Sequence, residues 1–168
     1  MGQYSKQLKN KLDGIINEMA ECPSLFARNP DKDFTRSRKI DFQNLIRILL
    51  SCGGNSLNKE LYDYYKQKNM TVTASAFVQQ REKLLPEGVE YLFHEFNSAC
   101  KNEKEYDGYR LLAVDGSTMT YNGTPAEDTF MPKHGTNGVN QFHVNALFDL
   151  LNIRAGSHSP SEPLHQVE

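Results

Sequence analysis

The sequence has no tryptophan, only three cysteines and no long hydrophobic run. Cys22, Cys52 and Cys100 are far apart, so no pair has metal-binding spacing, and their odd number argues against a disulfide framework. No apolar stretch approaches the roughly 20 residues needed to cross a bilayer, and the N-terminus lacks the apolar core of a signal peptide. These absences predict a cytoplasmic protein with reduced thiols and no membrane partner.

The charge of the chain is nearly balanced, with 19 Lys and Arg against 21 Asp and Glu. Basic residues nevertheless gather between Arg28 and Arg47, where six cations accompany three aspartates. Such a segment is typical of a surface that faces phosphate groups. Charge alone is equally compatible with a solvated charged loop.

The spacing of apolar residues predicts five helices in the first hundred residues. The first carries Leu8 to Met19 and ends at Pro23, and the second spans residues 42–51 with Asp41 as its N-cap. The others span residues 56–68, 74–85 and 87–100. The third and fourth are joined by a short polar turn, which allows a helix-turn-helix arrangement.

The fourth predicted helix and the basic segment supply the candidate DNA contacts. Gln80 belongs to a polar side of that helix in this prediction, and glutamine can pair with adenine while arginine pairs with guanine or phosphate. The candidates are Arg36, Arg38, Lys39, Gln80, Arg81 and Lys83. The alternative is an ordinary helical hairpin with a polar face toward solvent, and the pattern alone favours this alternative.

The spacing of apolar residues changes from a helical to a strand pattern after residue 108. Residues 109–114 and 140–151 have the patterns of strands, residues 121–138 read as a loop, and residues 153–168 show neither period, which predicts disorder. Five helices followed by two strands predict an α+β chain, with a helical module before the start of a sheet domain.

Asp115 is the main candidate for chemistry, because a short apolar strand runs directly into it and Gly116 follows. A carboxylate at the end of a strand suits a hard-metal ligand or a catalytic acid, although Asp-Gly is also a common turn pair. Asp149 would be a second carboxylate near Asp115 if the two strands pair, but it reads better as a surface residue. His134 and His143 are isolated, and His143 is predicted to be exposed.

Six segments, taken in order, resemble one family. They are Asp-Phe-Thr-Arg-Ser-Arg-Lys-Ile-Asp-Phe (33–42), Gly-Asn-Ser-Leu-Asn-Lys-Glu-Leu (54–61), Ser-Ala-Phe-Val-Gln-Gln-Arg (75–81), Tyr-Leu-Phe-His-Glu-Phe-Asn (91–97), Leu-Leu-Ala-Val-Asp-Gly-Ser (111–117) and Asn-Gln-Phe-His-Val-Asn-Ala-Leu-Phe-Asp-Leu-Leu-Asn (140–152). Together they resemble the N-terminal part of a DDE transposase of the bacterial insertion-sequence type 4 family. The likeness runs from about Cys22 to Asn152.

The resemblance implies a domain order and a metal site. Residues 1–105 would be a helical DNA-binding module, residues 106–152 the first strands of a truncated ribonuclease-H-like catalytic domain, and residues 153–168 a disordered tail outside the family. In that family two aspartates and a glutamate hold two Mg²⁺ ions for cut-and-paste DNA transposition, and Asp115 matches the first aspartate. The second aspartate and the glutamate of the Tyr-Arg-Glu-Lys signature have no match in this sequence.

Since one carboxylate cannot fix two ions, we expect this chain alone neither to cleave nor to join DNA. A frameshift, an early stop, a decayed element copy or an artificially split reading frame would each give such a sequence. The implied partner is DNA at terminal inverted repeats in the bacterial nucleoid, with a homo-oligomer or a hetero-oligomer with intact transposase as further expectations. Two alternatives are a non-enzymatic DNA-binding module that inhibits or pairs with intact transposase, and a helical interaction module without a DNA role.

Overall fold

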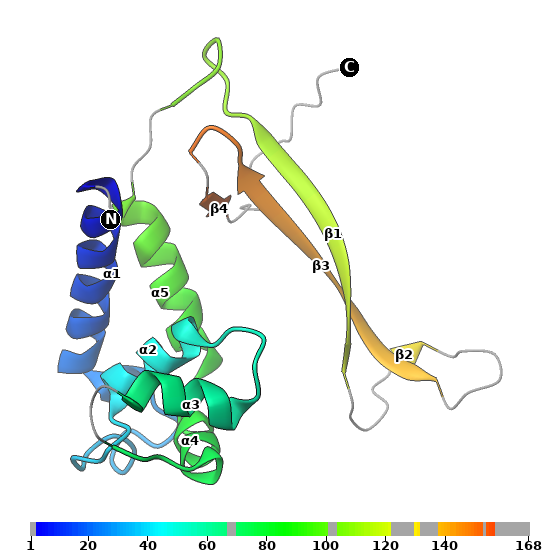
Figure 1. Cartoon of the computed structure of the whole chain (residues 1–168). Helices are drawn as coiled ribbons and strands as arrows, with labels where there is room; N and C mark the ends of the chain where they lie inside the picture. The colour runs from blue at the N-terminus through cyan, green and yellow to red at the C-terminus, as the bar shows by residue number, and fades with distance from the viewer. Residues whose placement is uncertain are drawn as a thin grey trace. The chain divides into compact units, whose positions relative to one another are not determined.

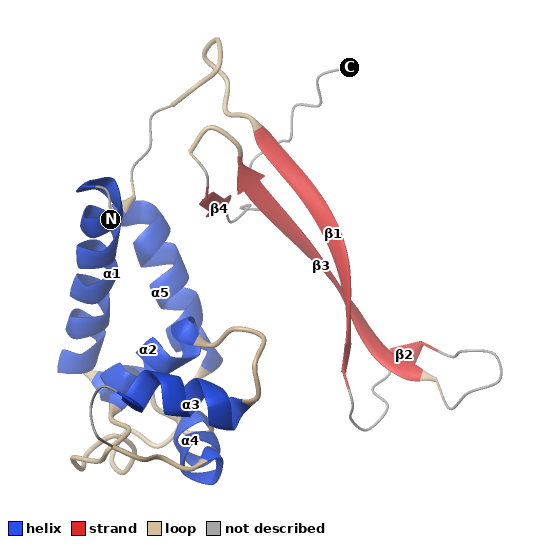
Figure 2. Cartoon of the chain, viewed as in Figure 1, coloured by secondary structure: helices blue, strands red, loops and turns tan. Residues whose placement is uncertain are grey.

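The computed structural model of the chain describes residues 3–66, 70–100, 104–121, 130–131, 138–152 and 154–156. The chain divides into two compact units, Met1–Cys100 and Lys101–Glu168. The first is helical and the second is built from strands, as Figures 1 and 2 show. The predicted α+β composition is therefore confirmed, and the predicted domain boundary after residue 105 lies within the second unit. None of the described helices is long and apolar enough to cross a membrane.

Among its described residues, the first unit contains five helices at the predicted places and one short 3₁₀ helix. They are α1 (Gln3–Glu21), η1 (Pro23–Phe26), α2 (Phe42–Ser51), α3 (Leu57–Tyr65), α4 (Ala74–Arg81) and α5 (Pro86–Ala99). Helix α2 packs against α1, α3 and α4, while α1 also lies beside α5 (Figure 1). Ile16, Leu45, Ile48, Leu61 and Phe77 are almost completely buried at the centre of this unit.

Residues within and next to α2 determine where this helix begins and which of its faces is buried. The carboxylate of Asp41 accepts a hydrogen bond of 2.7 Å from the backbone N–H of Asn44, which satisfies one of the free donors of the first turn. Phe42, Leu45, Ile46 and Ile48 are its buried residues. Burying such apolar side chains contributes about 1.5–3 kcal/mol each, so α2 stabilises the middle of the unit.

Helix α4 begins as predicted but ends earlier. The hydroxyl oxygen of Thr73 accepts a hydrogen bond from the backbone N–H of Ala76 at its start. Beyond Arg81 the chain turns, and the backbone N–H of Leu85 donates to the carbonyl oxygen of Phe26 at 2.9 Å. The prediction of a helix to residue 85 is wrong there, because this pairing with a distant segment replaces the last helical hydrogen bonds.

The second unit contains one long antiparallel ribbon. Its strands are β1 (Leu112–Tyr121), β2 (Phe130–Met131), β3 (Val139–Asp149) and β4 (Arg154–Gly156). Strands β1 and β3 pair along their length, from Leu112 opposite Asp149 to Tyr121 opposite Asn140. Strands β2 and β4 pair with the two ends of β3 (Figure 1).

Three sequence predictions about the second unit need correction. Phe130–Met131 form strand β2 within residues 121–138, which were predicted to be a loop. Strand β1 does not span residues 109–114, because it starts at Leu112 and continues through Asp115 and Gly116 to Tyr121. Pairing with β3 satisfies the backbone there, so the Asp-Gly pair does not turn. Residues 154–156 form a strand where disorder was predicted, while residues 153 and 157–168 lie outside the described residues.

Candidate functional site

The cations of the basic segment lie on a loop that the protein holds in place. This basic loop, residues 28–41, joins η1 to α2. Its Asp33 is 8% exposed and accepts hydrogen bonds of 3.0 and 3.1 Å from the backbone and side-chain N–H groups of Asn29. At its ends the backbone N–H of Arg28 donates to the carbonyl oxygen of Lys83 at 2.8 Å, and the Tyr65 hydroxyl donates to the carbonyl oxygen of Lys39 at 2.9 Å. The exposed cations of the loop are therefore carried on an ordered frame.

Tyr65 is one of the groups whose surroundings alter its ionisation. Burial of its ring, with smaller contributions from Tyr64 and Asp41, raises the pKa of Tyr65 to about 12. The hydroxyl therefore stays protonated at neutral pH and remains a donor to the basic loop.

Two hollows border the basic loop. The first hollow has a volume of about 330 Å³ and is lined by residues 31, 32, 34–36, 38, 40 and 41 of the loop together with Gln80 and Lys83. The second hollow, of about 480 Å³, lies between residues 37–40, residues 71–73 and the side of α4 at Ala76 and Gln80. Arg38, Ile40 and Gln80 line both, so the two hollows adjoin.

Positive charge prevails around the hollows. Among the described residues that line them are five cations, Lys32, Arg36, Arg38, Lys39 and Lys83, and two carboxylates, Asp31 and Asp41. The Asp41 carboxylate accepts a hydrogen bond from the Asn44 N–H and caps α2, so part of its negative charge is directed to the helix. The first turn of a helix also carries partial positive charge, and α2 begins at the first hollow. The arrangement suits a phosphate group better than a cation.

The structure brings together five of the six predicted DNA contacts. Arg36, Arg38 and Lys39 are exposed on the basic loop, and Gln80 and Lys83 reach the same hollows from α4 and the turn after it. Lys39 also donates from Nζ to the carbonyl oxygen of Thr71 at 3.4 Å. Arg81 is exposed and is not among the residues that line these hollows.

Gln80 does not lie on the polar side of α4 as predicted. It is 6% exposed and shares the buried face of the helix with Phe77, three residues earlier. Its side-chain oxygen accepts a hydrogen bond of 3.3 Å from Lys83 Nζ. A side chain in this position lines a hollow and does not project toward the edge of a base.

Sequence reasoning missed Lys32 and Phe34 at the first hollow. Lys32 belongs to the basic segment and could have been found by charge. Phe34 carries no charge that would have marked it as a candidate. Its backbone is left-handed with φ of 59°, which is rare for a bulky residue and which no residue pattern predicts. Its ring packs edge to face on Phe42 with 5.3 Å between ring centroids.

Asp115 lies in the middle of β1 rather than at the end of a strand. It pairs with Ala146, so it shares one face of the ribbon with Ala146 and with the flanking Val144 and Phe148. The Asp115 side chain is exposed. The structure therefore displays this carboxylate among apolar neighbours on a sheet face.

The structure does not bring Asp149 to Asp115. Asp149 pairs with Leu112, three residues along β1 from Asp115, so the two carboxylates point to opposite faces about 10 Å apart along the strand. Among the residues that the structure describes, no three His, Cys, Asp or Glu side chains gather closely enough to hold a metal ion.

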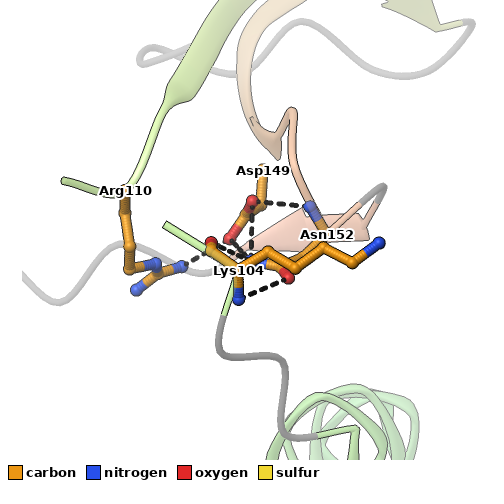
Figure 3. Close-up of polar contacts among 4 residues, drawn as sticks. All are labelled: Lys104, Arg110, Asp149 and Asn152. Atoms are coloured by element: carbon orange, nitrogen blue, oxygen red, sulfur yellow. Dashed lines mark hydrogen bonds and ion pairs between the residues drawn. The ribbon is translucent and has the colours of Figure 1, made fainter. Parts of the chain in front are cut away.

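Asp149 is the centre of a buried polar cluster, which Figure 3 shows. Its side chain is 0% exposed, so the prediction of a surface carboxylate is wrong. Asn152 donates to it from the backbone and from Nδ2 at 3.0 Å, and Arg110 donates at 3.3 Å. Asn152 also exchanges hydrogen bonds with the backbone of Lys104. Burial opposes ionisation of Asp149, but the hydrogen bonds from Asn152 and Arg110 outweigh it and hold its pKa below the ordinary value.

His143 lies on the face opposite Asp115 and is exposed, as predicted. Its ring passes close above Gly116, where a Cβ would stand 2.7 Å from Nε2. Glycine at position 116 therefore makes room for the imidazole. His134 lies outside the described residues.

No family model, curated protein or solved structure matches the chain.

Proposed function

We propose that this chain is the N-terminal part of a DDE transposase of the insertion-sequence type 4 family and that its helical unit binds DNA. The observation that carries DNA binding is the meeting of the basic loop and the end of α4 around two adjoining hollows. The resemblance of six ordered segments supplies the family and the order of the domains.

The cations support contact with the phosphate backbone. Five of them, Lys32, Arg36, Arg38, Lys39 and Lys83, line the hollows. A protein that neutralises five phosphates releases their counterions, so log Kobs would fall with log[salt] at a slope of roughly −4 to −5. Phosphate contacts position a protein on DNA and carry no sequence information directly.

Helices α3 and α4 contribute in a modified helix-turn-helix role. The connection between them, residues 66–73, is longer than the three or four residues of the motif, and α4 turns Phe77 and Gln80 inward. We assign α4 a supporting role, in which its end presents Lys83 beside the basic loop.

The ribbon would be the start of the ribonuclease-H-like domain. Asp115 is exposed on the face of the ribbon that also carries Val144 and Phe148. Further strands or helices of a larger domain could cover this face. In the intact family the residue at the position of Asp115 would be one of the Mg²⁺ ligands, and the bound metal would supply Lewis-acid activation for phosphodiester hydrolysis and strand transfer. With no matching second aspartate or glutamate, the chain alone binds DNA without cutting it.

Binding and cleavage can be tested separately on the purified full chain. Fluorescence anisotropy with duplex DNA, including terminal-inverted-repeat DNA, at two salt concentrations should show affinity that falls steeply as salt is raised. Supercoiled plasmid with Mg²⁺ or Mn²⁺ should stay unnicked. Affinity that does not change with salt would remove the phosphate interface, and robust cleavage would contradict the proposed incompleteness.

A second candidate function is a non-enzymatic partner of intact transposase. Large apolar side chains are exposed on both faces of the ribbon, among them Val114 at 59%, Met119 at 53% and Phe142 at 42%. Among the described residues β1 pairs with β3 alone, which leaves its other edge available for a strand. Such a surface would favour pairing with another chain, and co-purification with a catalytically complete family member would distinguish this role from DNA binding alone.

A further inference from the structure

The first hollow has a feature that contact with a duplex does not use. A B-form duplex presents a convex backbone, so its phosphates can reach cations that line the hollow, but the duplex cannot fill a concavity of about 330 Å³. This volume falls at the lower end of the range for small-ligand pockets, about 300–1,000 Å³. A ligand that fills it must be smaller than a duplex, and the four cations against two carboxylates in the lining favour a ligand with negative charge.

The wall of the first hollow combines an aromatic residue with cations. Phe34 lines it together with Lys32, Arg36, Arg38 and Lys83. An aromatic side chain within a positively charged groove is the combination that proteins use to bind unpaired nucleotides, with a base against the ring and the phosphate beside the cations. The second hollow is lined by Arg38 and Lys39 but by no aromatic residue that the structure describes, so it offers cations to the neighbouring backbone and no ring to a base.

The backbone at Phe34 is held in an unfavourable conformation. A φ of 59° brings the Cβ of a non-glycine residue close to the following carbonyl, and such strain persists only where surrounding contacts maintain it. Those contacts are present: the buried Asp33 holds Asn29, the Thr35 hydroxyl donates to the carbonyl oxygen of Lys32 at 3.0 Å, and the Phe34 ring rests on Phe42. The strain keeps an aromatic side chain at the wall of a basic hollow.

From this combination we infer that the first hollow receives one unpaired nucleotide, with its base against Phe34 and its phosphate between Arg36, Arg38 and Lys83. The inference rests on the proposed DNA binding and adds to it a preference for DNA that contains an unstacked nucleotide. Unstacking is least costly at a bulge, a mismatch or a strand end. The helical unit would therefore favour such a site over a continuous duplex.

The test compares two probes on the full chain by fluorescence anisotropy. One is a duplex of mixed sequence, and the other is the same duplex with a single bulged 2-aminopurine, whose fluorescence changes when the base leaves its neighbouring bases and enters the hollow. The bulged probe should bind about ten-fold more tightly, since stacking of a base on an aromatic side chain is worth about 5- to 150-fold in affinity. Its fluorescence should change as the complex forms.

Variants locate the effect. Phe34→Gly removes the ring and suits the positive φ, so it should abolish the preference and the fluorescence change, whereas Phe34→Tyr should retain both. Lys9→Gln on the exposed surface of α1 is the charge control and should leave the preference for the bulge intact. Because the wild-type fluorescence change needs no variant, the inference stays testable even where Phe34→Gly fails to fold.

The outcomes separate this inference from the proposed function. Equal affinity for the two probes, or an unchanged 2-aminopurine signal, would overturn the nucleotide site and leave duplex binding standing. A preference that survives in a folded Phe34→Gly variant would also overturn it. Failure to bind either probe at low salt would overturn DNA binding itself.

Discussion

The backbone N–H of Arg28 donates a hydrogen bond of 2.8 Å to the carbonyl oxygen of Lys83, and this contact fixes the start of the basic loop to the turn after α4. Two segments that are more than fifty residues apart in the chain thereby present their cations around the same hollows. Positive side chains on an ordered frame lose less conformational entropy on binding than those on a flexible loop.

The first prediction concerns charge at the first hollow. Arg36→Ala and Lys83→Ala should each weaken duplex binding to a similar degree for unrelated sequences, because they remove phosphate contacts. Each should also reduce the slope of log Kobs against log[salt] by about 1. Anisotropy titrations over a range of salt concentrations measure both quantities. Lys9→Ala, on α1, should leave the slope as it is, and an equal loss in this variant would show that only net charge matters.

The second prediction concerns the ordering of the basic loop. Asp33→Ala removes the acceptor of two Asn29 hydrogen bonds and should destabilise the helical unit by about 1–3 kcal/mol. It should weaken DNA binding as well, although it removes a negative charge. Urea denaturation and anisotropy measure the two effects. The matched variant Asp31→Ala, at an exposed position, should change stability by less than about 0.5 kcal/mol and should strengthen DNA binding.

Stronger binding by Asp33→Ala would contradict this account, because it would mean that charge outweighs the order of the loop.

The elements that could be predicted from the sequence are those whose bounds depend on residues close by in the chain. Helix α2 has the predicted bounds, since its Asp41 cap, its apolar stripe and its end all lie within a dozen residues. The hydrogen bond from the Asn152 N–H to Asp149 also had a local signal, because Asn152 follows at the spacing of a side-chain-to-backbone turn, but this signal did not predict that Asp149 is buried.

The remaining differences depend on distant partners. The length of β1 is decided by pairing with β3, and the end of α4 by pairing with Phe26. Gln80 is polar, yet it lies on the buried face because Phe77 directs that face inward. The left-handed backbone of Phe34 is maintained by tertiary contacts, and no residue pattern for it was present in the sequence. For the same reason the hollows could not be predicted, although most of their cations were named.

The third prediction concerns Gly116 and His143. A Cβ at Gly116 would lie 2.7 Å from Nε2 of His143, so Gly116→Ala should displace the ring and destabilise the ribbon by about 1 kcal/mol or less, because His143 is exposed and can rotate. The double variant Gly116→Ala/His143→Ala should recover this loss, since alanine is better than glycine in a strand. Urea denaturation followed by circular dichroism gives the four free energies of the cycle. Additive effects would show that the ring and the glycine do not interact.

The fourth prediction is a pH dependence that arises at Asp149. Its pKa in the folded chain lies below the ordinary value of 3.8, because hydrogen bonds from Asn152 and Arg110 stabilise the carboxylate despite its burial. A lowered folded-state pKa means that the stabilisation is present above that ordinary value and is lost as pH falls through the folded-state pKa. The ribbon should therefore lose stability in acid below about pH 4.

Asp149→Asn isolates this contribution. It should destabilise the ribbon by about 1–3 kcal/mol at neutral pH, because Arg110 loses its anionic partner and an amide cannot accept all the same hydrogen bonds. The variant should also lose most of the change in stability between about pH 5 and pH 2. Amide signals of β1 and β3 in NMR spectra, followed through urea denaturation at each pH, report on this unit separately. The control Asp107→Asn alters an exposed carboxyl in a turn and should keep the wild-type pH dependence, so an acid transition that persists in Asp149→Asn would place its origin at another group.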